Sequence, residues 1–264
     1  MSSEKTRADR ALVERKLAPT RQKALRYLLA GQVYAGEKKI DKPGQLLSRE
    51  EIQTLLIREK DPYVSRGAHK LLGAFESFDI SVEGVIAVDV GASTGGFTQV
   101  LLEKGAKRVY AVDVGYGQLD HNLRNDPRVV VLERENMRYL STEKIPEPVD
   151  FFTMDVSFIS CRLLLTPLRS FLKPNAKGVL LIKPQFEAGR QSVKKGIVRE
   201  TRVHREVIEN MIAYFCEEGW RCIGLDVSPI KGNKGNTEFL AYIEMAPFQE
   251  IDEKVIDHLV ERIS

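Results

Sequence analysis

The stretch VIAVDVGASTGGF, residues 85–97, decides the fold of most of the chain. It is apolar through Val90 except for Asp89, as in a strand buried on both faces of a sheet, and it then turns through glycines into an apolar helical run. Similar short apolar runs, with helical stretches between several of them, follow at residues 108–115, 128–133, 150–157 and 178–184. This alternation predicts a Rossmann-like α/β domain with a doubly wound, mostly parallel sheet.

The end of the chain departs from this alternation. After a helical run at residues 202–219, the segments 220–230 and 238–245 have the pattern of two strands joined by a short polar loop. Such a pair predicts an antiparallel last strand, at the edge of an otherwise parallel sheet.

Length and composition limit the class of protein. The chain has 264 residues, of which 43% are hydrophobic, enough for a full α/β domain and a small appendage. It has no apolar run of the roughly 18 residues that a membrane span needs, and its first ten residues show no apolar signal region, so we expect a cytoplasmic protein. Cys161, Cys216 and Cys222 form no CxxC pair, which predicts neither a disulfide framework nor a metal site.

The first 60 residues differ from the rest of the chain in net charge. Residues 1–60 hold 14 Lys and Arg against 8 Asp and Glu, whereas residues 61–264 hold 26 against 29. The pattern predicts two short helices followed by small strands, with a linker at about 58–65 and an apolar core of Leu12, Leu17, Leu25 and Leu28. This core leaves several basic side chains outside, where they could bind phosphate: Arg7, Arg10, Arg21, Lys23 and Arg26. A polyanion partner for this small domain is one interpretation, and a merely solvated basic surface is the other.

The glycine-rich turn predicts a cofactor site. Gly91, Gly95 and Gly96 follow the first strand, but Ser93 stands where a dinucleotide-binding turn has its second glycine, and the chain has no GK[ST] motif. We therefore expect a nucleoside ligand without phosphate at the turn, with the ribose hydroxyls bound by Asp113 at the end of the second strand. S-adenosylmethionine meets both conditions, and an ordinary strand–helix turn is the alternative.

Charged residues stand at three further strand ends. Asp155 closes the fourth strand, Lys183 closes the fifth, and Glu238 begins the last, while Lys70 lies on an amphipathic helix before the first strand. Two lysines and two carboxylates can neutralise one another, and repulsion between the lysines together with burial would lower the pKa of one of them. The group would then supply a general base for a weak acid such as a ribose hydroxyl.

The motifs YVSRGAHKL, DVGASTGGF, MDVSFIS, LIKPQFE and KGNTEF resemble those of the TlyA-type proteins, known both as hemolysins and as ribosomal RNA 2′-O-methyltransferases. The catalytic domain of that family is of the FtsJ class, and the first 60 residues resemble the small RNA-binding domain of the ribosomal protein S-four type. The resemblance covers nearly the whole chain. It implies a methyl transfer from S-adenosylmethionine to the 2′-hydroxyl of ribosomal RNA, at a cytidine, with domains at 1–60 and 61–264.

The resemblance also implies roles for single residues. Lys183 would accept the hydroxyl proton, Asp155 and Glu238 would position it, and Lys70 would lower its pKa and stabilise the oxyanion. The family's cofactor contacts fall on Asp89, Gly91, Ser93, Gly95, Gly96, Phe97, Asp113, Asn136 and Asp155, with Asn136 at the adenine. Ser93 and Thr94 depart from the Ala-Pro that the FtsJ class commonly has at these two positions.

Three other functions compete with this one. A membrane-active cytolysin would need a membrane-binding element, and the weakly amphipathic segment 255–264 is the candidate. A methyltransferase acting on a base nitrogen or a small molecule would keep the fold, but such enzymes tend to have prolines after the strand-end acid, where this chain has Val156 and Ser157. An RNA-binding protein without catalysis is the third, and the complete Lys-Asp-Lys-Glu group argues against it.

Overall fold

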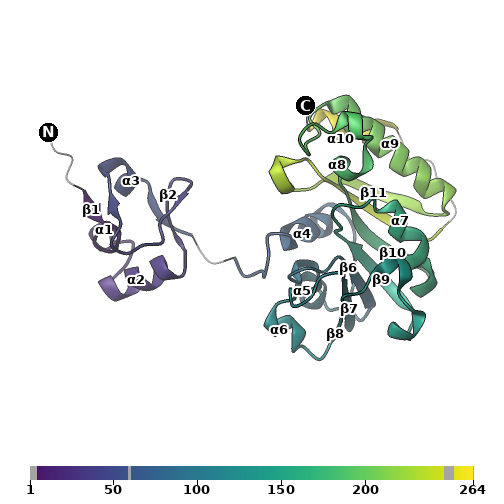
Figure 1. The fold of residues 1–264 in the computed structure, drawn as a ribbon, viewed down its shortest axis with the longest axis horizontal. Helices are drawn as coiled ribbons and strands as arrows, with labels where there is room; N and C mark the ends of the chain where they lie inside the picture. The colour runs from purple at the N-terminus through teal and green to yellow at the C-terminus, as the bar shows by residue number, and fades with distance from the viewer. Residues whose placement is uncertain (1–4, 59–60, 247–252, 264) are drawn as a thin grey trace. The chain divides into compact units, whose positions relative to one another are not determined.

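A computed structural model describes residues 5–58, 61–246 and 253–263. The chain divides into two compact units, Met1–Pro62 and Tyr63–Ser264, and each has a hydrophobic core of its own (Figure 1). We describe the two units separately.

The smaller unit packs two helices against short strands. Thr20 begins the second helix by accepting a hydrogen bond from Lys23 N, and Gly31 follows its end with a φ of 67°. The strands form the antiparallel sheets β1-β4 and β3-β2-β5. The elements, which include a first strand and a third helix beyond the sequence expectation, are β1 (Thr6–Arg7), α1 (Ala8–Glu14), α2 (Arg21–Leu29), β2 (Val33–Ala35), β3 (Lys38–Lys39), β4 (Leu46–Leu47), α3 (Arg49–Gln53) and β5 (Leu55–Ile57).

The core of this unit differs at one position from the expected set. Leu12 and Leu28 are fully buried and Leu17 packs against the same cluster, but Leu25 is 40% exposed. The expectation for Leu25 is wrong because Ala24 and Leu28, four residues apart, form the face of α2 that packs on α1. Leu25 lies next to Ala24 in sequence and points about 100° away from that face.

Two of the basic side chains that were expected to bind RNA, Arg7 and Arg21, are paired with the buried carboxylate of Asp9. Its oxygens accept hydrogen bonds from Arg7 Nε at 3.1 Å and from Arg21 Nε at 2.8 Å. Arg10 pairs with Glu14 at 2.7 Å. Of the five basic candidates, Lys23 and Arg26 are the exposed ones for which the described residues show no carboxylate partner.

We expect Asp9→Asn to destabilise the smaller unit by about 1–2 kcal/mol at neutral pH. The Arg7 side chain, acting against burial and together with Arg21, lowers the pKa of the Asp9 carboxyl to about 2. Because this pKa lies below the unfolded value, the stabilisation is complete above about pH 4 and disappears as the pH falls toward 2. Urea unfolding at pH 7 and at pH 2.5 measures it, and an equal loss of stability at both values would contradict this cause.

The larger unit contains a seven-stranded sheet in the order β11-β12-β10-β9-β6-β7-β8. All neighbouring strands are parallel except at β12, which is antiparallel to β10 and to β11. The mostly parallel Rossmann-like sheet with an antiparallel last strand is confirmed, but β12 lies inside the sheet and β11 forms the edge. The strands are β6 (Ile86–Val90), β7 (Arg108–Asp113), β8 (Val129–Glu133), β9 (Val149–Met154), β10 (Leu172–Ile182), β11 (Arg221–Val227) and β12 (Phe239–Glu244).

Helices cover both faces of this sheet (Figure 1). On one face lie α4 (Ala68–Ser77) and α5 (Gly96–Glu103), and on the other lie α7 (Arg162–Leu168), α9 (Thr201–Glu217) and α10 (Glu253–Glu261). Shorter helices at the ends of strands and in loops are α6 (His121–Arg124), α8 (Pro184–Glu187), η1 (Met137–Tyr139), η2 (Thr142–Lys144), η3 (Arg169–Phe171), η4 (Arg190–Ser192) and η5 (Asn233–Gly235).

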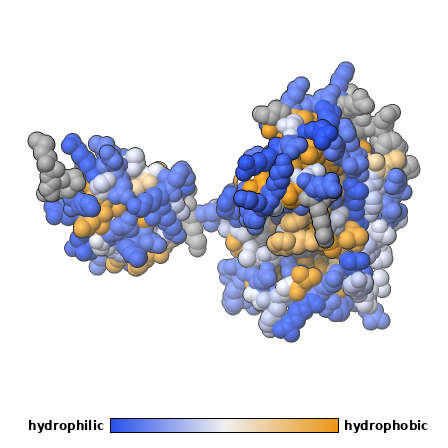
Figure 2. All heavy atoms as spheres, turned by 45° about the horizontal axis from the view of Figure 1, so that its top comes forward, coloured by the Kyte–Doolittle hydropathy of each residue, from blue (hydrophilic) through white to orange (hydrophobic). Residues whose placement is uncertain are grey.

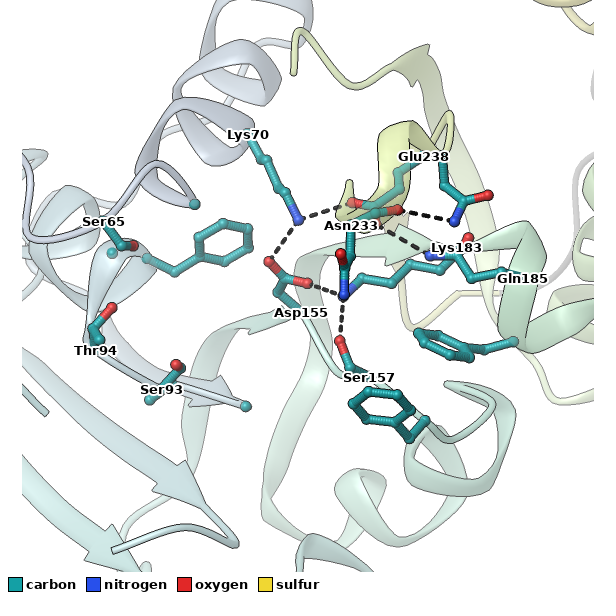
Figure 3. Close-up of a pocket in the computed structure, with 18 of the residues that line it drawn as sticks. Ser65, Lys70, Ser93, Thr94, Asp155, Ser157, Lys183, Gln185, Asn233 and Glu238 are labelled. Atoms are coloured by element: carbon teal, nitrogen blue, oxygen red, sulfur yellow. Dashed lines mark hydrogen bonds and ion pairs between the residues drawn. The ribbon is translucent and has the colours of Figure 1, made fainter. Parts of the chain in front are cut away.

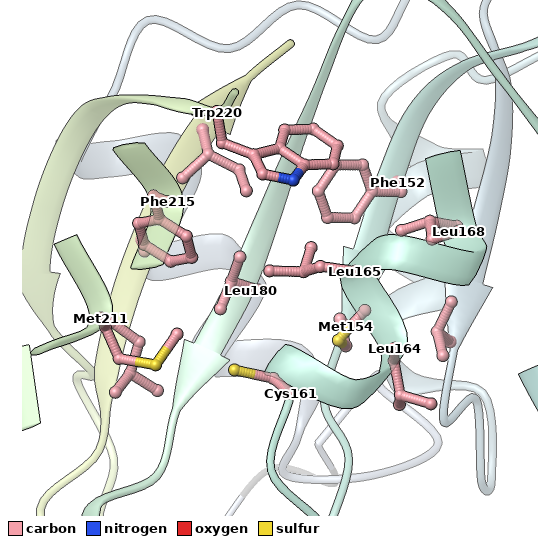
Figure 4. Close-up of a cluster of buried hydrophobic side chains, with 14 of the residues drawn as sticks. Phe152, Met154, Cys161, Leu164, Leu165, Leu168, Leu180, Met211, Phe215 and Trp220 are labelled. Carbon is pink, nitrogen blue, oxygen red and sulfur yellow. The ribbon is translucent and has the colours of Figure 1, made fainter. Parts of the chain in front are cut away.

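Alternation along the strands divides the core in two. Leu180 of β10 belongs to the cluster under α7 and α9, while Leu181 belongs to the cluster under α4 and α5. In the first cluster, Trp220 packs edge to face on Phe152 with ring centroids 5.5 Å apart (Figure 4). Hydrophilic side chains cover most of the visible face of this unit, and apolar ones gather toward its middle (Figure 2).

The C-terminal helix turns its apolar side inward. Ile256, Leu259 and Val260 of α10 are buried in the cluster under α9. The apolar side of this helix, which the cytolysin alternative would have to place on a membrane, therefore packs into the protein core. Within the described residues, no helix combines the length and the apolar character that crossing a membrane requires.

Candidate active site

Strand alternation places three charged residues on the same face of the sheet. All three lie at the end of the sheet where its parallel strands finish. In β9, Phe151 faces α4 and α5, so Asp155, four residues later, continues that face beyond the end of the strand. Lys183 stands in the same relation to Val179 and Leu181 of β10, and Glu238 to Leu240 of β12. Because β12 is antiparallel, its beginning lies beside the end of β10.

The fourth charge comes from the helix that covers this face. Lys70 of α4 approaches Asp155 Oδ2 with its Nζ at 3.1 Å and Glu238 Oε2 at 2.8 Å, and Lys183 Nζ lies 2.6 Å from Asp155 Oδ1 (Figure 3). Asp155 thus bridges the two lysines. The structure brings together the four residues of the expected tetrad, each of them from a different element.

The tetrad is nearly closed to solvent. Lys70 is 8% exposed, Lys183 is 6% exposed and Glu238 is buried, so each charge depends on its partners for stabilisation. Burial lowers the pKa of the Lys70 ammonium, but the carboxylates of Asp155 and Glu238 outweigh this effect and raise the pKa above its ordinary value. Both carboxylates therefore stabilise the charged form of Lys70.

Ser157 is a contact of Lys183 that the sequence does not reveal. Lys183 Nζ donates a hydrogen bond to Ser157 Oγ at 2.9 Å. An ammonium has three N–H bonds, and the contacts with Asp155 and Ser157 engage two of them. The third bond, or the lone pair that replaces it after deprotonation, is available to a ligand in the cavity that Lys183 lines.

The glycines of the turn permit close packing of three elements. Gly91 has a φ of 82°, and a Cβ there would lie 2.8 Å from the carbonyl oxygen of Asp155. A Cβ at Gly96 would lie 2.9 Å from Ala68 N at the start of α4, and one at Gly95 would lie 2.3 Å from Leu123 Cδ1 of α6. The turn thus holds the end of β9 and the helix of Lys70 close to the first strand.

Two adjoining cavities open at this edge. The first, about 410 Å³, contains the tetrad and is called the acceptor cavity here; it is also lined by Ser65, Gly67, Gly96 and Phe97. The second, about 580 Å³, is called the cofactor cavity and is lined by Asp113, Glu135 and Asn136. Both are of a size that holds small ligands. Their walls meet at shared residues, namely Gly91, Ser93, Asp155, Ser157 and Phe158.

Asp113 and Asn136 both line the cofactor cavity. Asp113 accepts hydrogen bonds from Ser93 N at 2.8 Å and from Gly115 N at 2.6 Å, so it holds the glycine-rich turn and still has lone pairs for ribose hydroxyls. Asn136 accepts one from Arg138 N at 3.1 Å through Oδ1, which leaves its amide N–H groups for an adenine edge.

Asp89 does not line either cavity. It is buried beneath the turn, where its two oxygens accept hydrogen bonds from Thr98 Oγ1 at 2.7 Å and Thr153 Oγ1 at 2.9 Å. Burial raises the pKa of this carboxyl to about 6, against the effect of the two hydroxyls. Its position suits support of the turn, and a direct cofactor contact is not what the structure shows for it.

Two aromatic residues at the mouth of the acceptor cavity were not among the site residues predicted from the sequence. Phe158 is 88% exposed, has a φ of 66° and contacts Phe186, with ring centroids 5.4 Å apart and ring planes tilted by 50°. Both residues line the acceptor cavity, as do Gln185 and Asn233 (Figure 3). Their place in the motifs MDVSF and LIKPQFE, close to Asp155 and Lys183, is the signal from which they could have been found.

The donor set of the two cavities suits an organic cofactor. Hydroxyl, amide and carboxylate groups surround the cofactor cavity, together with Val112, Met137 and Ile159 as apolar walls. In the described part of the chain, no group of three or more His, Cys, Asp and Glu is arranged to hold a metal ion.

Comparison with known proteins agrees with this geometry. Residues 63–245 match the family model described as FtsJ-like methyltransferase. A Bacillus subtilis protein named "Putative rRNA methyltransferase YqxC" is 49% identical, over 99% of this chain and 95% of its own. The Mycobacterium tuberculosis protein named "16S/23S rRNA (cytidine-2'-O)-methyltransferase TlyA" is 41% identical, over 98% of this chain and 97% of its own.

A solved structure shows the same fold over the whole chain. It is titled "Putative hemolysin from Streptococcus thermophilus" and aligns with a TM-score of 0.77 at 41% identity, covering 99% of this chain and 96% of that one. Sequence and structure therefore both relate this chain to proteins that carry methyltransferase names and hemolysin names.

Proposed function

Because this chain belongs to the FtsJ-like methyltransferase family, we propose that it methylates a ribose 2′-hydroxyl of ribosomal RNA, at a cytidine, with Lys183 as the general base. The observation that carries the proposal is the closed tetrad, in which Asp155 lies 2.6 Å from Lys183 and 3.1 Å from Lys70. S-adenosylmethionine is the methyl donor and supplies an electrophilic methyl group. Asp113 and Asn136 would hold its nucleoside, and Ser93 its other end, near the tetrad.

The tetrad provides a group, the amine of Lys183, that can accept the proton of a hydroxyl. Lys183, held by Asp155 and Ser157, presents its remaining position to the acceptor cavity and takes the hydroxyl proton there. The charged ammonium of Lys70, paired with Asp155 and Glu238, would stabilise the negative charge that develops on the ribose oxygen. Asp155 and Glu238 keep both lysines in place, so that the base is oriented when the ribose arrives.

The aromatic pair at the mouth supports a nucleotide as the acceptor. Phe158 and Phe186 line the acceptor cavity and Phe158 is largely exposed, so a base bound there could stack on Phe158 while its ribose reaches Lys183. In the smaller unit, Lys23 and Arg26 are exposed basic groups on α2 that suit contacts with RNA phosphates. We propose residues 1–60 as an RNA-binding domain and residues 61–264 as the catalytic domain.

The test is methyl transfer to ribosomal RNA with labelled S-adenosylmethionine, followed by nuclease digestion and mass spectrometry of the nucleosides. We expect the label on ribose, and 2′-deoxy substitution at the modified nucleotide should abolish its incorporation. A label on a base nitrogen would contradict the role of Lys183 and favour the base methyltransferase. Leakage of liposomes caused by the protein without cofactor would favour a cytolysin.

We expect Asp113→Ala to weaken the binding of S-adenosylmethionine by about 1.5–3 kcal/mol, because a charge-assisted acceptor for ribose hydroxyls is lost. Asp113→Asn keeps an oxygen for the backbone of the turn and serves as the matched variant, with a smaller loss. Isothermal titration calorimetry measures both. Unchanged affinity in the alanine variant would remove Asp113 from the cofactor site.

A further inference from the structure

Two loops form one side of the acceptor cavity. The first lip loop, residues 193–198, and the second lip loop, residues 231–237, both contribute to its wall, through Gly196 and through Asn233, Lys234 and Asn236. None of these four residues lines the cofactor cavity. The lip loops therefore face the substrate part of the site and not the nucleoside of the cofactor.

The side chain of Asn236 fastens the two loops together. It is buried, donates hydrogen bonds through Nδ2 to Gly196 O at 2.9 Å and Asn233 O at 3.0 Å, and accepts one from Val198 N at 3.1 Å through Oδ1. All its polar atoms are thus used within the lip loops. The relative position of the loops is fixed before any ligand binds, which lowers the entropic cost of binding.

Each lip loop carries a lysine in a costly backbone conformation. Lys195 has a φ of 54° and Lys234 a φ of 56°, in the left-handed region that residues with a Cβ seldom adopt. A glycine, Gly196 or Gly235, follows each lysine and is left-handed as well, with a φ of 81° in both cases. Such strain, kept in two neighbouring loops at the mouth of a cavity, is typical of functional positions.

Of the four lysines in the lip loops, Lys194 alone has a carboxylate partner among the described residues, Glu200 at 3.6 Å, and both of these side chains are exposed. Lys234 Nζ donates to the carbonyl oxygen of Lys195 at 3.1 Å, Lys231 Nζ donates to Thr237 Oγ1 at 2.7 Å, and for Lys195 the described residues show no side-chain partner. Elsewhere in the larger unit, by contrast, lysines pair with acids; examples are Lys70, Lys144, Lys173 and Lys183.

The sequence of the lip loops makes the same contrast. The lip loops, residues 193–198 and 231–237, contain four lysines and no acidic residue, although residues 61–264 together have 26 basic and 29 acidic residues. A positive rim on a net negative domain attracts an anion to this place in particular. Since the tetrad itself consists of two lysines and two carboxylates, the lip loops are the source of positive charge at the mouth.

We propose that Lys195 and Lys234 bind the RNA phosphodiester next to the ribose that is methylated, an inference that rests on the proposed function of the same site. The neutral carbonyl of Lys195 engages a single N–H bond of Lys234, so its other two can be donated to phosphate oxygens. The ammonium of Lys195 completes the site from the neighbouring loop. Contacts of this kind set the register of a nucleic acid without reading its sequence.

The second lip loop also connects this phosphate site to the tetrad. A Cβ at Gly232 would lie 1.9 Å from Glu238 Oε1, so the loop passes directly over the carboxylate that pairs with Lys70. Asn236, which fastens the loops, stands two residues before Glu238 in the chain. One short segment therefore fixes both the phosphate site and a carboxylate of the tetrad, and a bound phosphate sets the ribose relative to Lys183.

The test uses the full chain with the double variant Lys195→Glu/Lys234→Glu. Methyl transfer to ribosomal RNA gives KM and kcat, and RNA binding is titrated from 50 to 200 mM salt. Each lost phosphate contact removes about 0.7–0.9 from the slope of log K against log salt, so we expect the slope to fall by about 1.5 and KM for RNA to rise by at least about tenfold. The affinity for S-adenosylmethionine should not change.

Lys107→Glu is the matched control, because this exposed lysine directly precedes β7, at the end of the strand opposite to the cavities. It should leave the salt slope and KM as in the wild type. A slope in the double variant equal to that of the wild type would overturn the phosphate site while methylation of ribose by the wild type upheld the proposed function. Loss of cofactor affinity would also overturn it, since the lysines would then serve the cofactor.

The proposed function can fail independently. A wild-type protein that binds RNA but places no methyl group on ribose would contradict that function, while the salt slope of binding would still decide whether Lys195 and Lys234 contact phosphate.

Discussion

Lys183→Ala should reduce the rate of methyl transfer by about 10³-fold or more, because a positioned general base contributes roughly 10²–10⁴-fold. Its amine is the group of the tetrad with a position left for the acceptor, and its removal also leaves Asp155 with Lys70 alone. The affinity for S-adenosylmethionine should stay within about twofold, since Lys183 does not line the cofactor cavity. Single-turnover kinetics and calorimetry measure the two quantities.

Lys177→Ala is the matched control for this variant. Lys177 lies on the same strand, β10, six residues before Lys183 and therefore away from the cavities, and it pairs with Glu244 at 3.8 Å. Its loss should leave the rate unchanged. Ser157→Ala should have an intermediate effect, because it removes one hydrogen bond that orients the amine and keeps the amine itself. If Lys183→Ala retained the wild-type rate, another base would have to be sought.

Removal of residues 1–62 should have the largest effect on RNA affinity. If this unit makes three or four phosphate contacts, the remaining chain should bind folded ribosomal RNA about 100-fold more weakly near physiological salt, with a slope against salt smaller by about 3. Residues 63–264 form a compact unit with two core clusters of their own, so we expect them to stay folded and to bind S-adenosylmethionine normally. Shape is the feature that such a surface would read, so a short single strand should show little difference between the two chains.

Single charges refine this test. Lys23→Glu with Arg26→Glu should reproduce part of the loss, because both side chains are exposed on α2. Reversal at Arg7 or Arg21 is a poorer probe, since a carboxylate placed beside the buried Asp9 would destabilise the unit itself. Equal affinities and equal salt slopes for the full and the shortened chain would show that the basic unit is only a solvated surface.

Much of the active site could be predicted because β-strands impose their own geometry. A charged residue directly after a buried parallel strand lies at the carboxyl edge of the sheet, and strand alternation assigns its face. This predicts that Asp155 and Lys183 lie together, and the motif resemblance adds Glu238 and Lys70. The order of the last two strands could not be predicted, because a short loop fits an edge hairpin as well as an inserted β12.

The sequence pattern does not predict which side chains from distant segments form hydrogen bonds with each other. The burial of Asp89 between Thr98 and Thr153, and the capture of Arg7 and Arg21 by Asp9, depend on side-chain packing that no periodicity encodes. Leu25 shows that the pattern can also fail within one helix. Because alanines and leucines are adjacent in α2, the sequence does not decide which of two neighbouring residues faces the core. The lip loops escaped notice because left-handed lysines have no signature in composition.

The insertion of β12 between β10 and β11 has a consequence for biosynthesis. Glu238 enters the site only when this strand, the last one in the chain, has paired on both sides. Until then Lys70 lacks one of its two carboxylates and the lip loops lack Asn236. On the proposed function, we expect a nascent chain that still has residues 236–244 inside the ribosomal exit tunnel to be inactive. Enzymatic turnover would then report that β12 has paired with both of its neighbours.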